Sequence, residues 1–147
     1  MGHSYRVNFV HCVFSTKERA ESIPADLQPK LWAYISGICN NDNIQLLAIG
    51  GTSNHVHLLL ALPAAMRLSE AINRIKSNSS RWVGERRNGF AWQEGYGAFS
   101  VGASQLSTVR DYVRKQEVHH RKRNFEQEFV ELLERYGVSF NPKYMYG

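Results

Sequence analysis

Two short apolar runs joined by four turn-forming residues are the feature that most limits how this chain can fold. The runs cover residues 44–50 and 55–62, and Gly-Thr-Ser-Asn at 51–54 lies between them. Glycine and asparagine favour tight turns, so the pattern predicts a β-hairpin. The second run starts with His55-Val-His57. Because side chains alternate along a strand, both imidazoles should point to one face, about 7 Å apart along the chain, which is a metal-ligand geometry.

The segments around this hairpin predict the rest of an α+β fold. Strand-like residues occupy 5–16 and 90–102, the latter interrupted near Gly95 and Gly97, and apolar residues recur at helical spacing after Pro24 as far as 40–43 and after Pro63 as far as Asn88. The order β-α-β-β-α-β is that of the ferredoxin-like fold, an antiparallel sheet with two helices on one face. Its first and third strands are central neighbours, so His11 should lie close to the two hairpin histidines.

Two C-terminal helices should cover the free face of this sheet or dock on another subunit. We expect one from Ser104 or Ser107 to Lys122 and another from Phe125 until Gly137 caps it. The second helix carries an apolar stripe made of Phe125, Phe129, Leu132 and Leu133. This stripe and the basic helix before it exceed what one small sheet face is expected to bury, which predicts a two-fold homodimer with shared active sites.

Length and composition limit the class of protein. With 147 residues, 43% of them hydrophobic, the chain is expected to form one domain over residues 1–147. Cys12 and Cys39 lie in apolar segments without a zinc-finger spacing, which favours buried free thiols in a reducing compartment. The N-terminus lacks the apolar core of a signal peptide, and no apolar run approaches the roughly 18 to 20 residues of a membrane helix. We therefore expect a cytoplasmic protein.

Positive charge is concentrated in the middle of the chain. The whole sequence carries a net charge of +5, whereas the stretch from Arg67 to Arg123 contains twelve basic and five acidic residues, a net +7. Such a stretch suggests a surface for a polyanion, although solvated helix faces account for most of the individual charges. We expect the run Arg121, Lys122 and Arg123 to be a solvated basic patch, for which phosphate contact is also natural.

A second candidate pair lies in the predicted helix that ends at residue 122. Tyr112 and Gln116 are four residues apart, so a phenol and a neutral oxygen ligand should share one helix face. With His55 and His57, Gln116 would form an open site that binds Mg²⁺ or Mn²⁺ while phosphate oxygens and water complete the shell. Together these residues suggest a nuclease centre.

Tyr112 has two interpretations. An amphipathic tyrosine usually packs its ring and leaves its hydroxyl in water. Here, however, the neighbouring basic residues Arg110, Arg114 and Lys115 should favour the phenolate, and this makes Tyr112 the best candidate nucleophile.

Five segments of the chain resemble the single-tyrosine HUH transposases of small bacterial insertion sequences, in which HUH denotes His-hydrophobic-His. They are Phe14-Ser-Thr-Lys17, His55-Val-His57, Ser77-Asn-Ser-Ser-Arg-Trp82, Trp92-Gln-Glu-Gly-Tyr-Gly-Ala-Phe-Ser100, and Tyr112-Val-Arg-Lys-Gln116 with His119-His120. The resemblance covers essentially the whole chain. The HUH motif alone is loose, but the order and distance of all five segments are highly specific.

The resemblance implies a homodimer that cuts and rejoins single-stranded DNA at element ends. His55, His57 and Gln116 match the family's metal ligands, and Tyr112 matches its nucleophile, which forms a 5′-phosphotyrosine and frees a 3′-OH without ATP. The family also recognises DNA hairpins, and its tyrosine helix can complete the partner's active site. One departure is Asn54, which stands where the family often carries an acidic residue before the first histidine.

The function predicted from the sequence is therefore a metal-dependent single-strand DNA transposase or endonuclease. We expect these residues to contact DNA: Lys17, Arg19, Arg74, Lys76, Arg81, Arg110, Arg114, Lys115, His119 and His120. The two histidines of this set could also be general acids or simple surface residues. A domesticated hairpin-processing nickase would share the chemistry. A non-catalytic single-strand nucleic-acid binder is a rival from another class, although the RNP-type aromatic strand motif is missing, and a small-molecule metal hydrolase is a weaker third.

Overall fold

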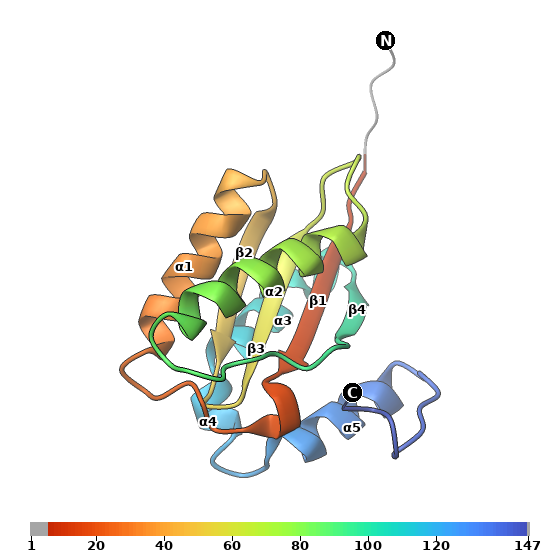
Figure 1. The fold of residues 1–147 in the computed structure, drawn as a ribbon. Coiled ribbons are helices and arrows are strands. Elements are labelled where there is room, and N and C mark those ends of the chain that lie inside the picture. Colours follow the sequence, from red (N-terminus) through yellow and green to blue (C-terminus); the bar gives the residue numbers. More distant parts are fainter. Residues whose placement is uncertain (1–5, 147) are drawn as a thin grey trace.

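The computed structural model describes residues 6–146, and its centre is a four-stranded antiparallel sheet in the order β2-β3-β1-β4 (Figure 1). The strands are β1 (Phe9–Ser15), β2 (Gln45–Gly51), β3 (His55–Ala61) and β4 (Gly97–Val101). β1 and β3 are the central neighbours, and their register pairs Val13 with His57 and Ser15 with His55. This order confirms the predicted ferredoxin-like fold and hairpin; residue 5 of the predicted first strand lies outside the described residues.

One face of the sheet is covered by two amphipathic helices, α1 (Gln28–Asn41) and α2 (Leu68–Gly84), which lie side by side in front of it in Figure 1. The strands supply alternate apolar residues to this face, among them Phe14 and Leu58. The helices contribute Leu31, Ile35 and Ile75, which are all fully buried. This is the main apolar core. Both helices were predicted, but α1 begins after a turn at Pro24, and α2 ends before Asn88.

The opposite face is covered by the C-terminal segments of the same chain. They are the short η2 (Ala103–Gln105), α3 (Leu106–Arg114), α4 (Gln116–His119) and α5 (Phe125–Arg135); the other short helix, η1 (Lys17–Arg19), follows β1. α3 packs on β2 and β3, where Leu59 and Val113 meet, and α5 packs around Val13 and Phe99. The helix cover therefore comes from this chain, which was one of the two predicted alternatives.

The apolar stripe of α5 is not left exposed, so the surface argument for a dimer is wrong. Its members Phe125, Phe129, Leu132 and Leu133 are 1–6% exposed and belong to one buried cluster with β1 and β4. α5 packs closely over Gly97, where an added Cβ would lie 2.6 Å from the Phe129 ring. A larger residue there would force the Phe129 ring to move.

The prediction of a single helix through residue 122 is also wrong, because the helix is interrupted at Lys115. That residue has φ −106° and ψ 33°, which ends α3 before α4 starts. Tyr112 and Gln116 therefore sit on two helices, although the Gln116 side chain still donates to the Tyr112 carbonyl at 3.1 Å. Beneath α3, an added Cβ on Gly50 would lie 2.0 Å from the Val113 carbonyl oxygen, so only glycine lets the tyrosine helix approach β2 this closely.

Within residues 6–146, no helix is both long enough and apolar enough to span a bilayer. Cys12 and Cys39 are buried free thiols, as predicted. The cytoplasmic location stays a prediction.

Candidate active site

The predicted H-x-H pair forms the floor of a buried cluster of side chains under α4 and α5. His55 and His57 project from the same side of β3 with ring centroids 5.1 Å apart, and both are fully buried. His11 on β1 lies next to them, with Nε2 2.8 Å from His57 Nδ1. The predicted proximity of His11 is confirmed, and it follows directly from the pairing of β1 with β3.

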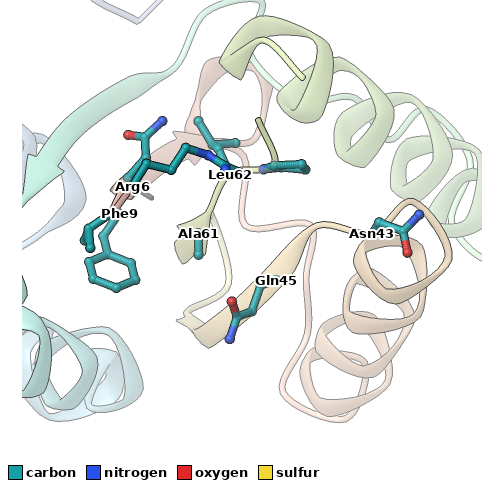
Figure 2. A pocket seen from close by; sticks show the side chains of 9 residues that line it. Arg6, Phe9, Asn43, Gln45, Ala61 and Leu62 are labelled. Atoms are coloured by element: carbon teal, nitrogen blue, oxygen red, sulfur yellow. The ribbon is translucent and has the colours of Figure 1, made fainter. Parts of the chain in front are cut away.

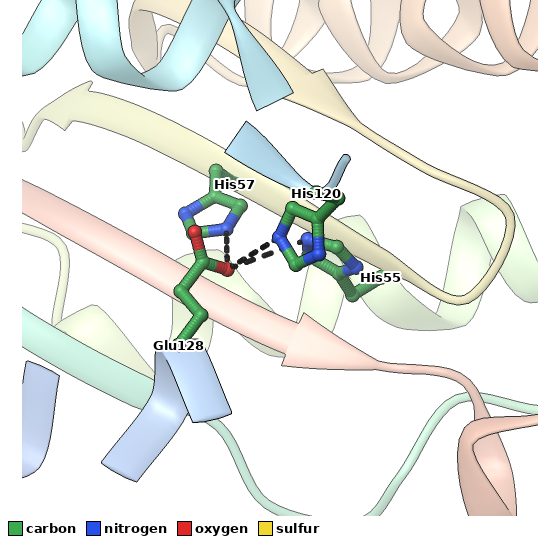
Figure 3. Close-up of side chains that lie close together, drawn as sticks. All are labelled: His55, His57, His120 and Glu128. Carbon is green, nitrogen blue, oxygen red and sulfur yellow. Dashed lines mark hydrogen bonds and ion pairs between the residues drawn. The ribbon is translucent and has the colours of Figure 1, made fainter. Parts of the chain in front are cut away.

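Glu128 on α5 joins the histidines together, as Figure 3 shows. Its Oε1 atom lies 2.8 Å from His57 Nε2, 3.0 Å from His120 Nε2 and 3.5 Å from His55 Nε2. The four ligand atoms of this cluster all lie within 4.8 Å of one another. His120 thus belongs to the buried centre, whereas the sequence favoured a DNA contact or a surface position for it.

Two imidazoles of this buried centre, those of His11 and His55, are neutral, and its carboxylate is ionised. Burial, reinforced by neighbouring His57, lowers the pKa of both His11 and His55 to about 3. Burial alone would raise the pKa of Glu128, but the charge interaction with His57 and three hydrogen-bond donors hold this pKa well below its usual range. At neutral pH the two histidines are uncharged and Glu128 carries a negative charge.

Asn54 and Thr52 both contact the same ring nitrogen of His55. His55 Nδ1 lies 2.9 Å from Asn54 Oδ1 and 3.0 Å from Thr52 Oγ1. The Asn54 amide oxygen can only accept, so a proton on Nδ1 suits this contact and leaves a lone pair on Nε2. Asn54 therefore performs the orienting role that a carboxylate would perform in its place.

Lone pairs converge at His55 Nε2 in a way that suits a cation. Gln116 Oε1 lies 3.2 Å from this nitrogen, and Glu128 Oε1 lies 3.5 Å from it. None of the three atoms has a proton to offer the others when His55 is protonated on Nδ1. A divalent metal would satisfy all three, and imidazole with carboxylate and amide oxygen is a chemically suitable donor set. The residues present thus fit a metal ion.

Tyr112 is held at the edge of the same cluster. Its hydroxyl donates to Glu128 Oε2 and accepts from Arg123 Nη2 at 2.9 Å. The His119 ring stacks on the Tyr112 ring with centroids 4.6 Å apart. Glu128 therefore contacts the histidines through one oxygen and the phenol through the other.

The expectation that nearby basic residues favour the Tyr112 phenolate is wrong for this resting arrangement. Burial and the Glu128 carboxylate raise the pKa of Tyr112, and the cation that opposes the rise is Arg123. The predicted neighbours Arg114 and Lys115 are exposed. The phenol is therefore protonated at neutral pH.

Several of the residues predicted to contact DNA already have partners within the protein. Lys17 is exposed, but Arg19 pairs with Glu126 at 2.8 Å and Arg74 pairs with Glu70 at 2.7 Å. Arg81 donates to Asn78. Side chains that already have a protein partner within the described part of the chain are less available to phosphate.

Lys76 departs most clearly from that prediction. Lys76 Nζ donates to the carbonyls of Gln93, Glu94 and Gly95 at 2.6 to 3.1 Å, and burial lowers its pKa to about 8. It ties the loop before β4 to α2. Arg110 Nε is buried and has no hydrogen-bond partner among residues 6–146. Lys76 is a structural lysine and not a free phosphate contact.

A large open cavity lies at the other end of the sheet from the histidines. Figure 2 shows its lining, which includes Arg6, Phe9, Asn43, Gln45 and Ala61, and its volume is about 810 Å³. Phe9 pairs with Ala61 at one end of the β1–β3 ladder, whereas Ser15 pairs with His55 at the other. None of the described residues that line this cavity is a histidine, cysteine, serine, tyrosine or carboxylate.

Comparison with known proteins identifies the family of the chain. The sequence model of the family described as "Transposase IS200 like" matches residues 4–116. Transposases for insertion sequence element IS200 from Salmonella typhimurium and Salmonella typhi are each 25% identical over 114 residues, which cover 72% of this chain and 74% of theirs.

Two solved structures share the fold. A candidate transposase from Deinococcus radiodurans has a TM-score of 0.63 at 19% identity, covering 77% of this chain and 94% of that one. A REP-associated tyrosine transposase bound to a REP hairpin has a TM-score of 0.58 at 15% identity, covering 77% of this chain and 70% of that one.

Glu128 and Arg123 are the site residues that sequence reasoning missed, and both lie beyond the matched residues 4–116. Glu128 did leave a signal. It stands three residues after Phe125 and four before Leu132, on the apolar stripe itself. A carboxylate facing a core needs a buried partner.

Proposed function

The chain belongs to the IS200-like family of tyrosine transposases, and on that premise we propose that it cuts and rejoins single-stranded DNA through Tyr112. The observation that carries this proposal is the convergence of the Tyr112 hydroxyl with a buried histidine cluster through one carboxylate, Glu128. A phenol that only packed against the protein would need no such neighbours.

The proposed step is a transesterification at phosphorus. The Tyr112 oxygen forms a bond to phosphorus while the bond from phosphorus to the 3′ oxygen of the preceding nucleotide breaks. The electron pair leaves with that 3′ oxygen, which takes up a proton and becomes a 3′-OH. The phenol proton passes to Glu128 Oε2, which already accepts its hydrogen bond. The product is a 5′-phosphotyrosine, and a second 3′-OH can reverse the step without ATP.

A divalent metal is proposed to bind at His55 and His57, with Gln116 as predicted and with Glu128 and His120 in reach. When bound, it would withdraw charge from the phosphate oxygens and so make phosphorus easier to attack. Of the two ions predicted, Mn²⁺ suits this nitrogen-rich set better, because Mg²⁺ is held chiefly by oxygen ligands. His11 would hold His57 in place through their hydrogen bond.

The proposed substrate is single-stranded DNA with a hairpin near the cut. The support for the hairpin is the REP-associated tyrosine transposase, whose structure shares this fold and holds a REP hairpin. The exposed residues Lys17, Arg114 and Lys115 are the predicted DNA contacts that have no hydrogen bond or ion pair to side chains within residues 6–146. The homodimer implied by the sequence resemblance stays a prediction, now without support from an uncovered apolar surface.

The test is covalent capture of DNA. The probe is a single-stranded oligonucleotide with a hairpin flanked by randomised arms and a label at its 3′ end, incubated with Mn²⁺. The parent should yield a labelled protein adduct that survives denaturant, because the phenol bonds to the 5′-phosphate side of the cut. Tyr112→Phe should bind the hairpin and give no adduct, and its free energy of unfolding should fall by about 1 to 3 kcal/mol, because the buried Glu128 carboxylate loses one donor. An undiminished adduct from Tyr112→Phe would overturn the proposal, and Tyr144→Phe on an exposed tyrosine is the matched control.

A further inference from the structure

Arg123 stands apart from the basic run in which it lies. Its neighbours Arg121 and Lys122 are exposed, whereas the Arg123 side chain is 27% exposed and turns toward the active site. Its Nη2 atom donates to the Tyr112 hydroxyl oxygen at 2.9 Å. An ion pair from Nη1 to Glu131 on α5 holds the guanidinium in this orientation. The prediction of a solvated patch therefore fails for Arg123.

The hydrogen bond from Arg123 is directed at the atom that would attack. The Tyr112 oxygen gives its proton to Glu128 and receives a donor from Arg123, so the two partners fix the direction of its lone pairs. As the phenol proton leaves, negative charge gathers on this oxygen. A donor already in place stabilises such charge without having to reorganise.

The guanidinium also has donors to spare. It carries five N–H groups, and the contacts with Tyr112 and Glu131 use two of its three nitrogens. The remaining donors lie on a partly exposed side chain beside the nucleophile. Arginine forms bidentate hydrogen bonds to phosphate, so one side chain can contact the tyrosyl oxygen and a phosphate oxygen together.

We propose that Arg123 is a catalytic residue that holds the Tyr112 oxygen and contacts the scissile phosphate during attack. This inference rests on the proposed function, because it takes Tyr112 as the nucleophile. It adds a group from outside the residues that match the family, which end at 116. Segment 120–124 and α5 then contribute to the chemistry as well as to the cover of the sheet.

Arg123→Gln and Arg121→Gln form a matched pair, since each removes one positive charge from the same loop. The measurement is the rate of adduct formation at saturating amounts of the hairpin oligonucleotide, with affinity measured separately. We expect Arg123→Gln to slow the rate by about 100-fold or more, as for loss of one transition-state donor. Hairpin affinity should change by no more than about threefold in either variant, as for one lost phosphate contact, and Arg121→Gln should keep the parental rate.

Arg123→Lys completes the design, because it keeps the charge but not the planar fork. It should recover part of the lost rate, and it also replaces Arg123→Gln as the test if that variant proves to be unfolded by circular dichroism. A parental adduct rate in a folded Arg123 variant would overturn the proposal, as would equal rate losses in the Arg121 and Arg123 variants. Failure of the proposed function looks different: the parent would give no adduct, or Tyr112→Phe would still give one.

Discussion

The two faces of the sheet differ in what their strands bury. Under α1 and α2 the strands present apolar residues such as Cys12, Phe14 and Leu58. Under α3 and α5 the same strands present His11, His55 and His57 between two small apolar clusters. One face is a continuous apolar core, while the other is divided by a buried polar centre.

This difference indicates how one small fold separates stability from chemistry. Apolar burial is roughly additive and tolerates repacking, so the first face can stabilise the sheet with little demand on geometry. A buried carboxylate and imidazoles lower stability unless each polar atom is paired, so the second face depends on exact partners. Because strand side chains alternate, the register that buries Leu58 on one face also directs His57 to the other.

The largest effect expected is the loss of chemistry from His57→Ala. This change removes a candidate metal ligand and leaves Glu128 Oε1 without its 2.8 Å partner. We expect no detectable adduct, while hairpin affinity stays within about threefold of the parent because no phosphate contact is lost. Excess chelator should abolish adduct formation by the parent protein in the same assay. Full activity in chelator would exclude a metal from this face of the sheet.

Mixing two inactive variants tests whether the polar centre belongs to one chain. Tyr112 contacts Glu128 and His119 of its own chain, which favours an active site within a single subunit. A mixture of His57→Ala with Tyr112→Phe should then stay inactive. Adduct on the His57→Ala subunit would instead support the shared sites implied by the sequence resemblance.

A substitution on the apolar face should instead lower stability and leave the adduct rate unchanged. Leu58→Ala truncates a fully buried side chain and should lower the free energy of unfolding by about 3 to 5 kcal/mol, measured with urea. The adduct rate per folded molecule should stay parental. Leu59→Ala is the matched comparison, because Leu59 is equally buried but packs with Val113 under the tyrosine helix. It should lose similar stability and also slow the adduct; equal activity in both variants would mean that the faces are not separate.

The sequence predicted most of what depends on local pattern. The hairpin, the order of strands and the shared face of His55 and His57 follow from alternation and turn residues, and the proximity of His11 follows from topology. The helix break at Lys115 could not be predicted, because residues 107–122 have good helical spacing and their packing on β2 is a contact between distant segments.

The partners of Tyr112 depend on contacts between distant segments. Arg123 lies eleven residues away and Glu128 sixteen residues away, in a loop and in a helix whose docking is set by the apolar stripe and by Gly97. The stripe was visible in the sequence. The sequence does not show which polar residues α5 brings close to Tyr112, because that depends on the angle at which α5 meets the sheet.

Lowering the pH should reduce what the polar face contributes to the free energy of unfolding, and it should not change the contribution of the apolar face. His11 and His55 have an ordinary pKa of 6.5, lowered by burial to about 3 in the folded protein. Below pH 6.5 the unfolded chain therefore binds more protons at these two histidines than the folded chain does. Their contribution to the free energy of unfolding is fully present above pH 6.5 and is lost as the pH drops toward 3. Each histidine contributes a slope of up to about 1.4 kcal/mol per pH unit.

Urea unfolding of the metal-free protein between pH 7 and pH 5 measures this slope. The parent should lose about 2 to 3 kcal/mol per pH unit below pH 6, and His11→Gln should lose about half as much. The buried thiols of the apolar face do not titrate in this range, because burial raises the pKa of both Cys12 and Cys39 to about 12. A flat profile in the parent would mean that the histidines are not held neutral.

The smallest effect expected concerns Asn54, which contacts the candidate metal ligand His55. Asn54 Oδ1 lies 2.9 Å from His55 Nδ1, where it can accept a hydrogen bond. In Asn54→Asp a carboxylate would accept the same hydrogen bond more strongly and make Nε2 a better ligand, so Mn²⁺ should bind about tenfold more tightly, and Asn54→Leu should bind it about 10- to 100-fold more weakly. Titration of free Mn²⁺ by electron paramagnetic resonance measures both without DNA. Asn73→Asp on α2 adds the same charge on the apolar side of the sheet and should change nothing. If Asn73→Asp tightened binding as much as Asn54→Asp, the gain would come from overall charge, and the hydrogen bond to His55 would not tune the site.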